Sequence, residues 1–146
     1  MDKVVAISSG GGHWTELMLL QETFGESVHY VTTDKDLPIS KNISRYSIVT
    51  DANKEKPFKL VLMFFQLFLV YINVRPKVII STGAAPGVVF LLIGKVFRSK
   101  TIWVDSLANA DELSLAGKIA SRFCDHTFTQ WSELESKSVK YIGRVL

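Results

Sequence analysis

The amino-acid sequence predicts an α/β fold, a Rossmann-like parallel sheet flanked by helices. Three observations predict it. Short, nearly continuous apolar runs alternate with longer segments of helical periodicity. A glycine-rich turn directly follows the first apolar run, and polar or glycine-containing turns follow several later ones. The length of 146 residues suits one domain, so we expect a single domain over residues 1–146.

Strands are expected at the apolar runs, because a strand of a parallel sheet is covered on both faces and needs no polar side. In chain order they span residues 4–7, 28–32, 46–49, 78–81, 101–104, 126–129 and 139–142. Polar or glycine-rich turns follow five of them, at residues 10–13, 33–34, 81–83, 105–106 and 130–131. Parallel strands end along one edge of the sheet, where ligands bind, so the sequence predicts a crevice there.

Helices are expected between the strands, at residues 13–24, 58–74, 87–97 and 113–123. In the first, His13, Leu17, Leu20 and Phe24 fall on one face, a spacing typical of a side that packs on the core. The polar stretch 33–44 is predicted to be a mobile loop. Alternating strands and helices imply right-handed crossovers and a doubly wound sheet.

Composition excludes several classes of function. The net charge of +3 comes with neither a basic helix nor interleaved basic and aromatic residues, so no nucleic-acid partner is expected. The single cysteine, Cys124, excludes an internal disulfide and fits a reducing compartment. Together with the three histidines it shows no metal-ligand spacing, so no metal site is predicted. No signal peptide is expected, because the first strand follows the amino terminus directly.

The first turn carries the most informative motif, Gly10, Gly11 and Gly12 followed by His13. It lacks the third glycine of a dinucleotide fingerprint and the Lys-Ser/Thr ending of a P-loop. One interpretation is a tight turn that His13 caps. We favour an anion site of backbone N–H groups, since three successive glycines exceed what a turn requires. His13 would then contact phosphate or act as a general base, and Glu16 would orient His13 or complement the helix dipole.

Two further turns supply candidate residues. Ser81, Thr82 and Gly83 end a buried strand, and such small residues either permit close approach of a ligand or serve packing alone. Asp105, followed by Ser106, ends another apolar strand. Its carboxylate is predicted either to cap a helix or to accept hydrogen bonds from sugar hydroxyls.

The segment 58–72 is the most apolar part of the chain, since thirteen of its fifteen residues are apolar. As a helix it would be about 22 Å long, shorter than the ~30 Å hydrocarbon core of a bilayer, so we do not expect it to span a membrane. Either it is buried between the sheet and a partner, or its outer face enters a membrane surface. The side chains predicted to associate with a membrane are Phe58, Leu62, Phe65, Phe68 and Leu69.

Several motifs together resemble the asparagine-linked glycosylation protein 14 family, including its bacterial capsule and exopolysaccharide members. The motifs lie at residues 9–17, 104–106, 113–118, 128–131 and 141–144, and thus extend over most of the chain. That family is the acceptor-side half of a split GT-B glycosyltransferase, and the fold it implies is the amino-terminal half of a GT-B enzyme.

The resemblance implies a membrane-associated subunit of a two-chain UDP-sugar glycosyltransferase, a hexosyltransferase. It would elongate a polyprenyl-diphosphate-linked saccharide in capsule or exopolysaccharide biosynthesis, peripherally at the cytoplasmic face of the plasma membrane. A partner similar to asparagine-linked glycosylation protein 13 would bind the UDP-sugar, so this chain would hold no cofactor and be inactive alone. Gly10 to His13 would face the acceptor's diphosphate, with Asp105 at the family's acidic position. The residues implied to dock on the partner are Gln130, Trp131, Arg144, Val145 and Leu146.

Two alternatives stay open. The chain could be a noncatalytic membrane scaffold that recruits the catalytic partner, in which case His13 would be dispensable for transfer. It could also be a free-standing small-molecule binder of flavodoxin type. The large apolar segment 58–72 argues against the second alternative, because such a binder has no need of it.

Overall fold

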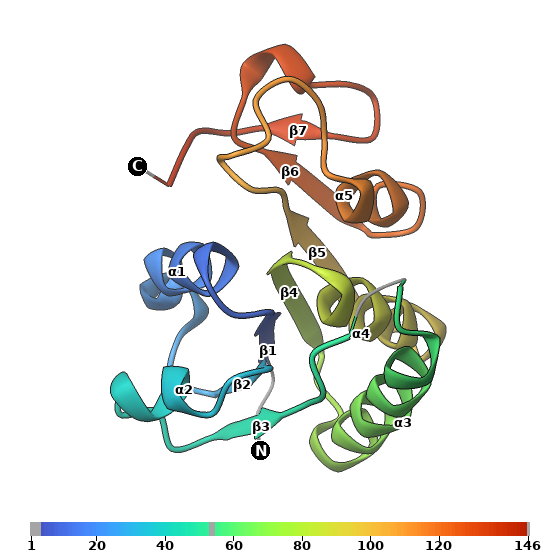
Figure 1. Cartoon of the computed structure of the whole chain (residues 1–146). Coiled ribbons are helices and arrows are strands. Elements are labelled where there is room, and N and C mark those ends of the chain that lie inside the picture. Colours follow the sequence, from blue (N-terminus) through green and yellow to red (C-terminus); the bar gives the residue numbers. More distant parts are fainter. Residues whose placement is uncertain (1–3, 53–54, 146) are drawn as a thin grey trace.

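The computed structural model describes residues 4–52 and 55–145, which form one parallel sheet with helices on both faces (Figure 1). The sheet has seven strands in the order β3-β2-β1-β4-β5-β6-β7, and every neighbouring pair is parallel. The predicted fold class is confirmed. Of the predicted docking residues, Leu146 lies outside the described residues.

All seven predicted strands form, each within two residues of its expected bounds. They are β1 (Val4–Ser8), β2 (Val28–Thr32), β3 (Tyr46–Ile48), β4 (Val78–Gly83), β5 (Lys100–Val104), β6 (His126–Thr129) and β7 (Lys140–Tyr141). Strand β4 extends past its predicted end because Gly83 pairs with Ser8 of β1 after an irregularity in the register. This pairing brings the two glycine-containing turns, after β1 and after β4, next to each other.

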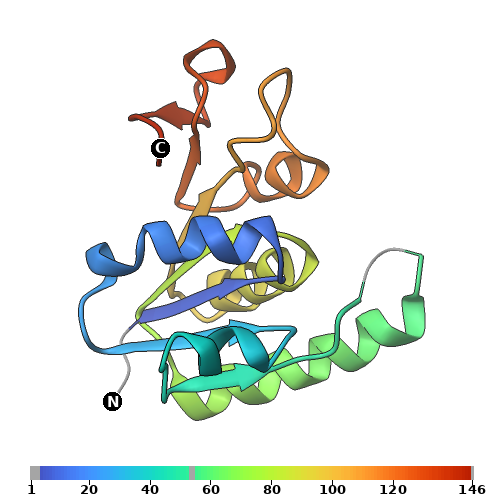
Figure 2. The same ribbon diagram turned by 60° about the vertical axis from the view of Figure 1, so that its left-hand side comes forward.

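The helices are α1 (Gly12–Leu19), α2 (Asp36–Ser40), α3 (Pro57–Val74), α4 (Ala85–Val96) and α5 (Leu115–Ala120), with short 3-10 turns at Gln21–Phe24 and Ser132–Leu134. Helices α1 and α2 cover one face of the sheet, and α3, α4 and α5 cover the other (Figures 1 and 2). Proline at the start of α3 and of α4 fits the first turn of a helix, where its missing N–H would have no intrahelical partner.

Two expectations about local structure are wrong. The first helix ends at Leu19 rather than Phe24. Of the predicted core face, Leu17 is fully buried and Phe24 packs against the same cluster, but His13 and Leu20 are only half-buried, and the second buried residue of the helix is Trp14. The stretch 33–44 is not a loop throughout, because it contains α2. At the start of that helix, Asp34 Oδ1 accepts a hydrogen bond from the Asp36 N–H.

The core has one cluster on each face of the sheet. On one face, Met63 and Leu67 of α3 and Phe90 of α4 are fully buried against the strands. On the other face, Trp14 and Leu17 of α1 pack on residues of β1 and β2. Because both faces of the central strands are covered, these strands read as continuous apolar runs in the sequence.

The strand order fixes where a ligand can bind. Chain connections lead away from β1 toward β2 and β3 on one side, and from β4 toward β5 and β6 on the other. At such a switch point, the turns beyond the carboxyl ends of the two central strands diverge and leave a crevice. Here those are the turns after β1 and β4, which carry the predicted glycine motifs.

Candidate functional site

The glycine-rich turn after β1 leaves its backbone amides uncovered. Gly11, the residue directly before α1, has a φ of 69°, a left-handed conformation that glycine adopts without strain. No side-chain hydrogen bond caps this helix start, and a Cβ added at Gly11 or Gly12 would meet nothing within 4 Å. The first N–H groups of a helix have no partner within it, so these amides can bind an anion. The predicted anion site therefore has the room that it needs.

His13 is held by the turn after β4. Its Nδ1 lies 3.2 Å from the carbonyl oxygen of Thr82, and the Thr82 hydroxyl donates to the His13 carbonyl at 2.7 Å. Because a carbonyl can only accept, Nδ1 is the protonated nitrogen in this bond, which leaves the lone pair on Nε2. A Cβ at Gly83 would collide with the imidazole ring, so only glycine allows the ring this position.

Glu16 does not orient His13, so that alternative is wrong. Its Oε1 accepts hydrogen bonds from the backbone N–H of Leu107, at 2.7 Å, and from Nε2 of Gln130, at 2.9 Å. Glu16 thus ties α1 to the turns that follow β5 and β6. Spacing along the chain indicates only neighbours on the same helix, whereas these partners are far away in the sequence.

Ser81 and Thr82 direct their side chains into the protein. Both are buried, and Ser81 Oγ accepts the Gly83 N–H at 3.1 Å. A Cβ at Gly87 would collide with the Ser81 side chain, so the small residues of this segment permit close packing of α4 on β4. These two side chains shape the turn that holds His13 rather than facing a ligand.

Asp105 is a buried structural carboxylate. Its side chain is 1% exposed and accepts three hydrogen bonds, from Trp103 Nε1 at 3.0 Å, from Ser114 N–H at 3.0 Å and from Ser114 Oγ at 2.6 Å. Ser114 in turn caps α5 by accepting the Gly117 N–H. Of the two predicted roles, helix capping describes this arrangement, although it acts through Ser114. Ser106 accepts the Ala108 N–H within the following turn.

Replacing Asp105 with Ala should lower the free energy of unfolding by about 3 kcal/mol, because one buried and two partly buried donors would lose their acceptor. Denaturant titration of the purified chain measures this loss. Asp111→Ala removes an exposed carboxylate from the same connection and serves as the matched control, with an expected change within about 0.5 kcal/mol. Equal stability of the two variants would contradict the structural role of Asp105.

A cavity of about 730 Å³ opens beside the glycine turn, beyond the ends of β1, β2 and β3. It is lined by Ser9, Gly10, Thr33, Asp34, Lys35, Ile48 and Asp51. The turn 33–34 was predicted on this edge of the sheet, but Lys35, Ile48 and Asp51 were not singled out. Their positions at or within three residues of the ends of β2 and β3 are the signal that the sequence offers. The cavity offers two carboxylates, one ammonium and the amides of the turn to one ligand.

Gln130 connects the carboxyl-terminal segment to the crevice. Its side chain is buried and donates from Nε2 to Glu16 Oε1 and to the carbonyl of Asp105, while its Oε1 accepts the Val145 N–H at 3.0 Å. Arg144 donates from Nε to the Gln130 carbonyl at 3.1 Å. Gln130 is therefore too buried to form a docking surface itself. Its hydrogen bonds instead hold Arg144 and Val145, which are more exposed, in place.

The exposed part of this segment forms an apolar recess. The Arg144 guanidinium lies 4.2 Å from the ring centroid of Trp131, whose indole N–H donates to the Leu107 carbonyl at 2.7 Å. Beside them is a recess of about 220 Å³, lined by Leu20, Val104, Phe128, Thr129, Gln130, Ile142, Gly143, Arg144 and Val145. Its most exposed apolar side chain, Ile142, is 77% exposed.

Helix α3 presents an apolar face to solvent. Of the five side chains predicted to meet a membrane, Phe58, Leu62, Phe65 and Leu69 are exposed, by 51% to 90%. The fifth, Phe68, is half-buried and packs against Phe97. Among the described residues, α3 is the one helix long and apolar enough to cross a membrane, which corrects the expectation, drawn from the shorter segment 58–72, that it is too short. Only Met63, Leu67 and Tyr71 in it are buried. Pure core packing therefore does not account for this helix.

Among residues 4–52 and 55–145, no group of three His, Cys, Asp or Glu side chains is placed to hold a metal ion. Burial raises the pKa of the Cys124 thiol to about 11, so this thiol is protonated and unreactive at neutral pH. The chemistry available at the crevice is that of backbone amides, one imidazole and the carboxylates of the neighbouring cavity.

Residues 29–145 match the model of a protein family described as "Oligosaccharide biosynthesis protein Alg14 like". The matched range includes the segments around Asp105, Gln130 and Arg144, and it begins after the glycine-rich turn. The resemblance read from the sequence is thereby confirmed.

Curated relatives are named as subunits of a transferase. The chain is 35% identical over 69 residues to "UDP-N-acetylglucosamine transferase subunit ALG14" of Yarrowia lipolytica, which covers 43% of this chain and 32% of that protein. It is 33% identical over 94 residues to the ALG14 subunit of Mus musculus, covering 58% and 42%. The matches thus span less than half the length of these relatives.

Solved structures share the fold. MurG of Acinetobacter baumannii superposes with a TM-score of 0.77 at 14% identity, over 97% of this chain and 45% of that one. UDP-GlcNAc 2-epimerase of Methanocaldococcus jannaschii superposes with a TM-score of 0.71 at 12% identity, again over 97% and 45%. The fold is that of one half of a GT-B type protein, as predicted.

Proposed function

The chain belongs to the Alg14-like family of oligosaccharide biosynthesis proteins, and from this membership we propose that it is the acceptor-side subunit of a two-chain UDP-sugar glycosyltransferase. The observation that carries the proposal is the uncapped glycine turn with His13 at the switch point of the sheet. The relatives' name, a subunit of a UDP-N-acetylglucosamine transferase, supports the class of reaction.

The acceptor is proposed to be a saccharide linked to a polyprenyl diphosphate. Its diphosphate binds the amides of residues 10–12, because successive N–H groups at a helix start match the oxygens of a phosphate. Its sugar occupies the neighbouring cavity, where Asp34 and Asp51 accept hydrogen bonds from hydroxyls. Lys35 pairs with the remaining phosphate charge.

His13 acts in the proposed reaction as the general base. An acceptor hydroxyl attacks the anomeric carbon of the UDP-sugar, so that a new C–O bond forms while the bond from that carbon to the diphosphate breaks. UDP leaves with the bonding electrons, and the hydroxyl proton passes to Nε2 of His13. The hydrogen bond from Nδ1 to Thr82 keeps Nε2 free for this proton. In the alternative role, His13 binds the phosphate of the acceptor and takes no part in proton transfer.

The partner is proposed to be a nucleotide-sugar-binding chain similar to asparagine-linked glycosylation protein 13. It would seat against Trp131, Arg144 and the recess around Ile142, which together form an apolar surface with a cationic rim. Gln130 and Glu16 link this surface by hydrogen bonds to α1, which carries His13. A chain of hydrogen bonds thus joins the proposed docking surface to the helix that borders the acceptor crevice.

The exposed face of α3 is proposed to attach the subunit peripherally to the cytoplasmic face of the plasma membrane. Attachment places the crevice next to a lipid-linked acceptor, because α3 begins beside the sheet edge where the crevice lies. The pathway is proposed to be bacterial capsule or exopolysaccharide biosynthesis, the pathway of the bacterial members of the family that the sequence resembles.

Reconstitution tests the two-chain reaction. The purified chain, the purified partner and their mixture are each supplied with a radiolabelled UDP-sugar and a polyprenyl-diphosphate-linked acceptor. We expect product from the mixture only, because each chain holds one substrate. Turnover by this chain alone would contradict the proposal. The noncatalytic scaffold would be favoured by a different result. In it, the partner alone, once bound to vesicles, transfers sugar as fast as the vesicle-bound mixture of both chains.

A further inference from the structure

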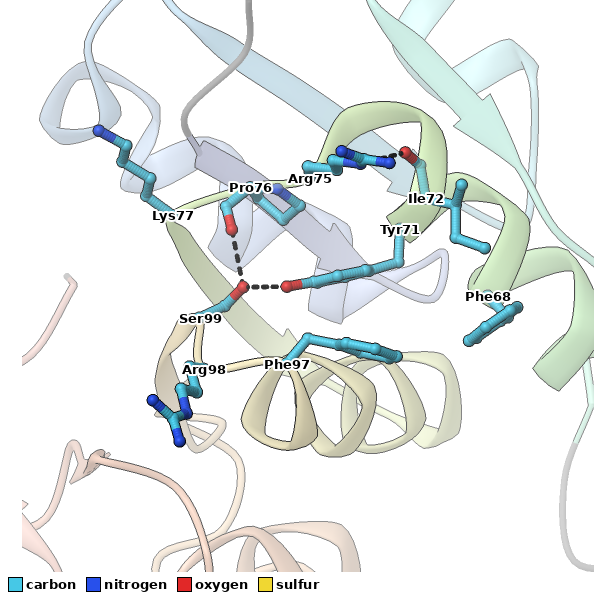
Figure 3. A pocket seen from close by; sticks show the side chains of 9 residues that line it. All are labelled: Phe68, Tyr71, Ile72, Arg75, Pro76, Lys77, Phe97, Arg98 and Ser99. Atoms are coloured by element: carbon cyan, nitrogen blue, oxygen red, sulfur yellow. Dashed lines mark hydrogen bonds between the residues drawn. The ribbon is translucent and has the colours of Figure 1, made fainter.

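A second hollow lies at the edge of the sheet opposite the crevice. It is a groove of about 570 Å³ between the end of α3, the turn leading into β4 and the turn leading into β5 (Figure 3). Its nine lining residues are Phe68, Tyr71, Ile72, Arg75, Pro76, Lys77, Phe97, Arg98 and Ser99. Because it lies at the amino-terminal ends of β4 and β5, it is separate from the acceptor site.

The floor of the groove is aromatic. Phe97 stacks on Tyr71 with 5.3 Å between ring centroids, and Phe68 lies 6.1 Å from Phe97. The hydroxyls on this floor are already bonded, since Ser99 Oγ donates to the Pro76 carbonyl at 2.7 Å and lies 2.6 Å from the Tyr71 hydroxyl (Figure 3). The floor therefore offers apolar surface to a ligand.

The rim of the groove is cationic. Arg75, Lys77 and Arg98 are exposed, and none of the nine lining residues is acidic. Arg75 lies over the end of α3 and donates to the Ile72 carbonyl, while Lys77 and Arg98 lie at the other end of the groove and point outward in different directions (Figure 3). Three positive charges without a lining carboxylate call for an anionic ligand.

The apolar floor continues onto the exposed face of α3. Ile72 is 43% exposed and Phe97 is 52% exposed, and Leu69 lies one turn before Ile72 on the helix. We propose that this groove binds the headgroup of an anionic phospholipid, with its acyl chains along α3. A soluble phosphate would not need the aromatic floor, and a neutral lipid would not need three cations.

The proposal rests on the membrane attachment in the proposed function, but not on sugar transfer. Helix α3 starts near the crevice edge of the sheet, after β3, and ends at the groove, before β4. Over its 18 residues it is about 27 Å long. If the phospholipid holds one end and the lipid-linked acceptor the other, α3 lies lengthwise in the membrane surface rather than across the bilayer.

Vesicle sedimentation tests the groove. The variant Arg75→Gln, Lys77→Gln, Arg98→Gln removes the rim, and the control Lys41→Gln, Lys137→Gln, Lys140→Gln removes equal charge from exposed positions elsewhere. For vesicles of phosphatidylcholine with phosphatidylglycerol, we expect the rim variant to bind roughly 100-fold more weakly than the unaltered chain. For phosphatidylcholine alone, we expect no change. The control should keep most of its affinity for the anionic vesicles.

Equal losses in the two triple variants would overturn the proposal, because binding would then follow net charge alone. The absence of any preference for anionic vesicles would also overturn it. Transfer to a water-soluble acceptor by the reconstituted pair should stay unchanged in the rim variant. The two assays test the two proposals separately, since binding to anionic vesicles can be lost while sugar transfer is retained, and sugar transfer can be absent while vesicle binding is retained.

Discussion

His13→Ala should lower sugar transfer by the reconstituted pair roughly 100- to 10,000-fold, the usual contribution of a general base. The imidazole is half-exposed at the crevice and is held only by the turn after β4, so its removal should leave the fold and partner assembly intact. Initial rates at saturating acceptor measure the effect on kcat. His126→Ala is the matched control, because His126 is exposed at the amino-terminal end of β6 and should be dispensable.

Gly83→Ala should reproduce much of this loss although His13 itself is not replaced. The new methyl group would occupy the space of the imidazole ring, so His13 would have to leave its position beside Thr82. An undiminished rate in both His13→Ala and Gly83→Ala, with normal assembly, would contradict the role of His13. The noncatalytic scaffold would then describe this chain better.

Removing the apolar face of α3 should release the chain from membranes. In Phe65→Gln, Leu69→Gln, two side chains that are 59% and 61% exposed lose their affinity for hydrocarbon. Burying such a side chain contributes about 1.5–3 kcal/mol, so the double variant should bind neutral vesicles at least roughly 100-fold more weakly. Flotation of the chain with phosphatidylcholine vesicles measures this.

The control for α3 is Leu19→Gln, Ile39→Gln, which alters two comparably exposed apolar residues on the opposite face of the sheet. We expect it to bind vesicles like the unaltered chain. If the α3 variant also binds normally, membrane attachment through α3 is contradicted. A folded α3 variant that instead loses self-association would identify this face as a contact between copies of the chain.

Much of the fold was predictable, because covered strands must be apolar on both sides. Runs such as those of β2 and β6 have the same bounds in the sequence and in the structure. The edge that gathers the glycine turns follows from parallel strands alone. The exposed apolar face of α3 was also predictable, since an apolar circumference cannot all face one core.

The contacts that define the site were not predictable, because they join residues remote in the sequence. The partners of Glu16 are Leu107 and Gln130, and the hydrogen bonds of Asp105 depend on where Ser114 falls after a long connection. A carboxylate after a strand looks the same in the sequence whether it faces a ligand or a helix start. Only the packing of α5 decides between the two.

Hydrogen exchange at the glycine turn tests the central claim most directly, namely that this chain holds the lipid-linked diphosphate while its partner holds the nucleotide sugar. The isolated chain is measured with a polyprenyl-diphosphate-linked sugar in detergent micelles, and separately with a UDP-sugar. We predict that the acceptor slows exchange of the amides in residues 10–14 and that the UDP-sugar leaves them unchanged. Protection by the UDP-sugar together with no effect of the acceptor would contradict the account.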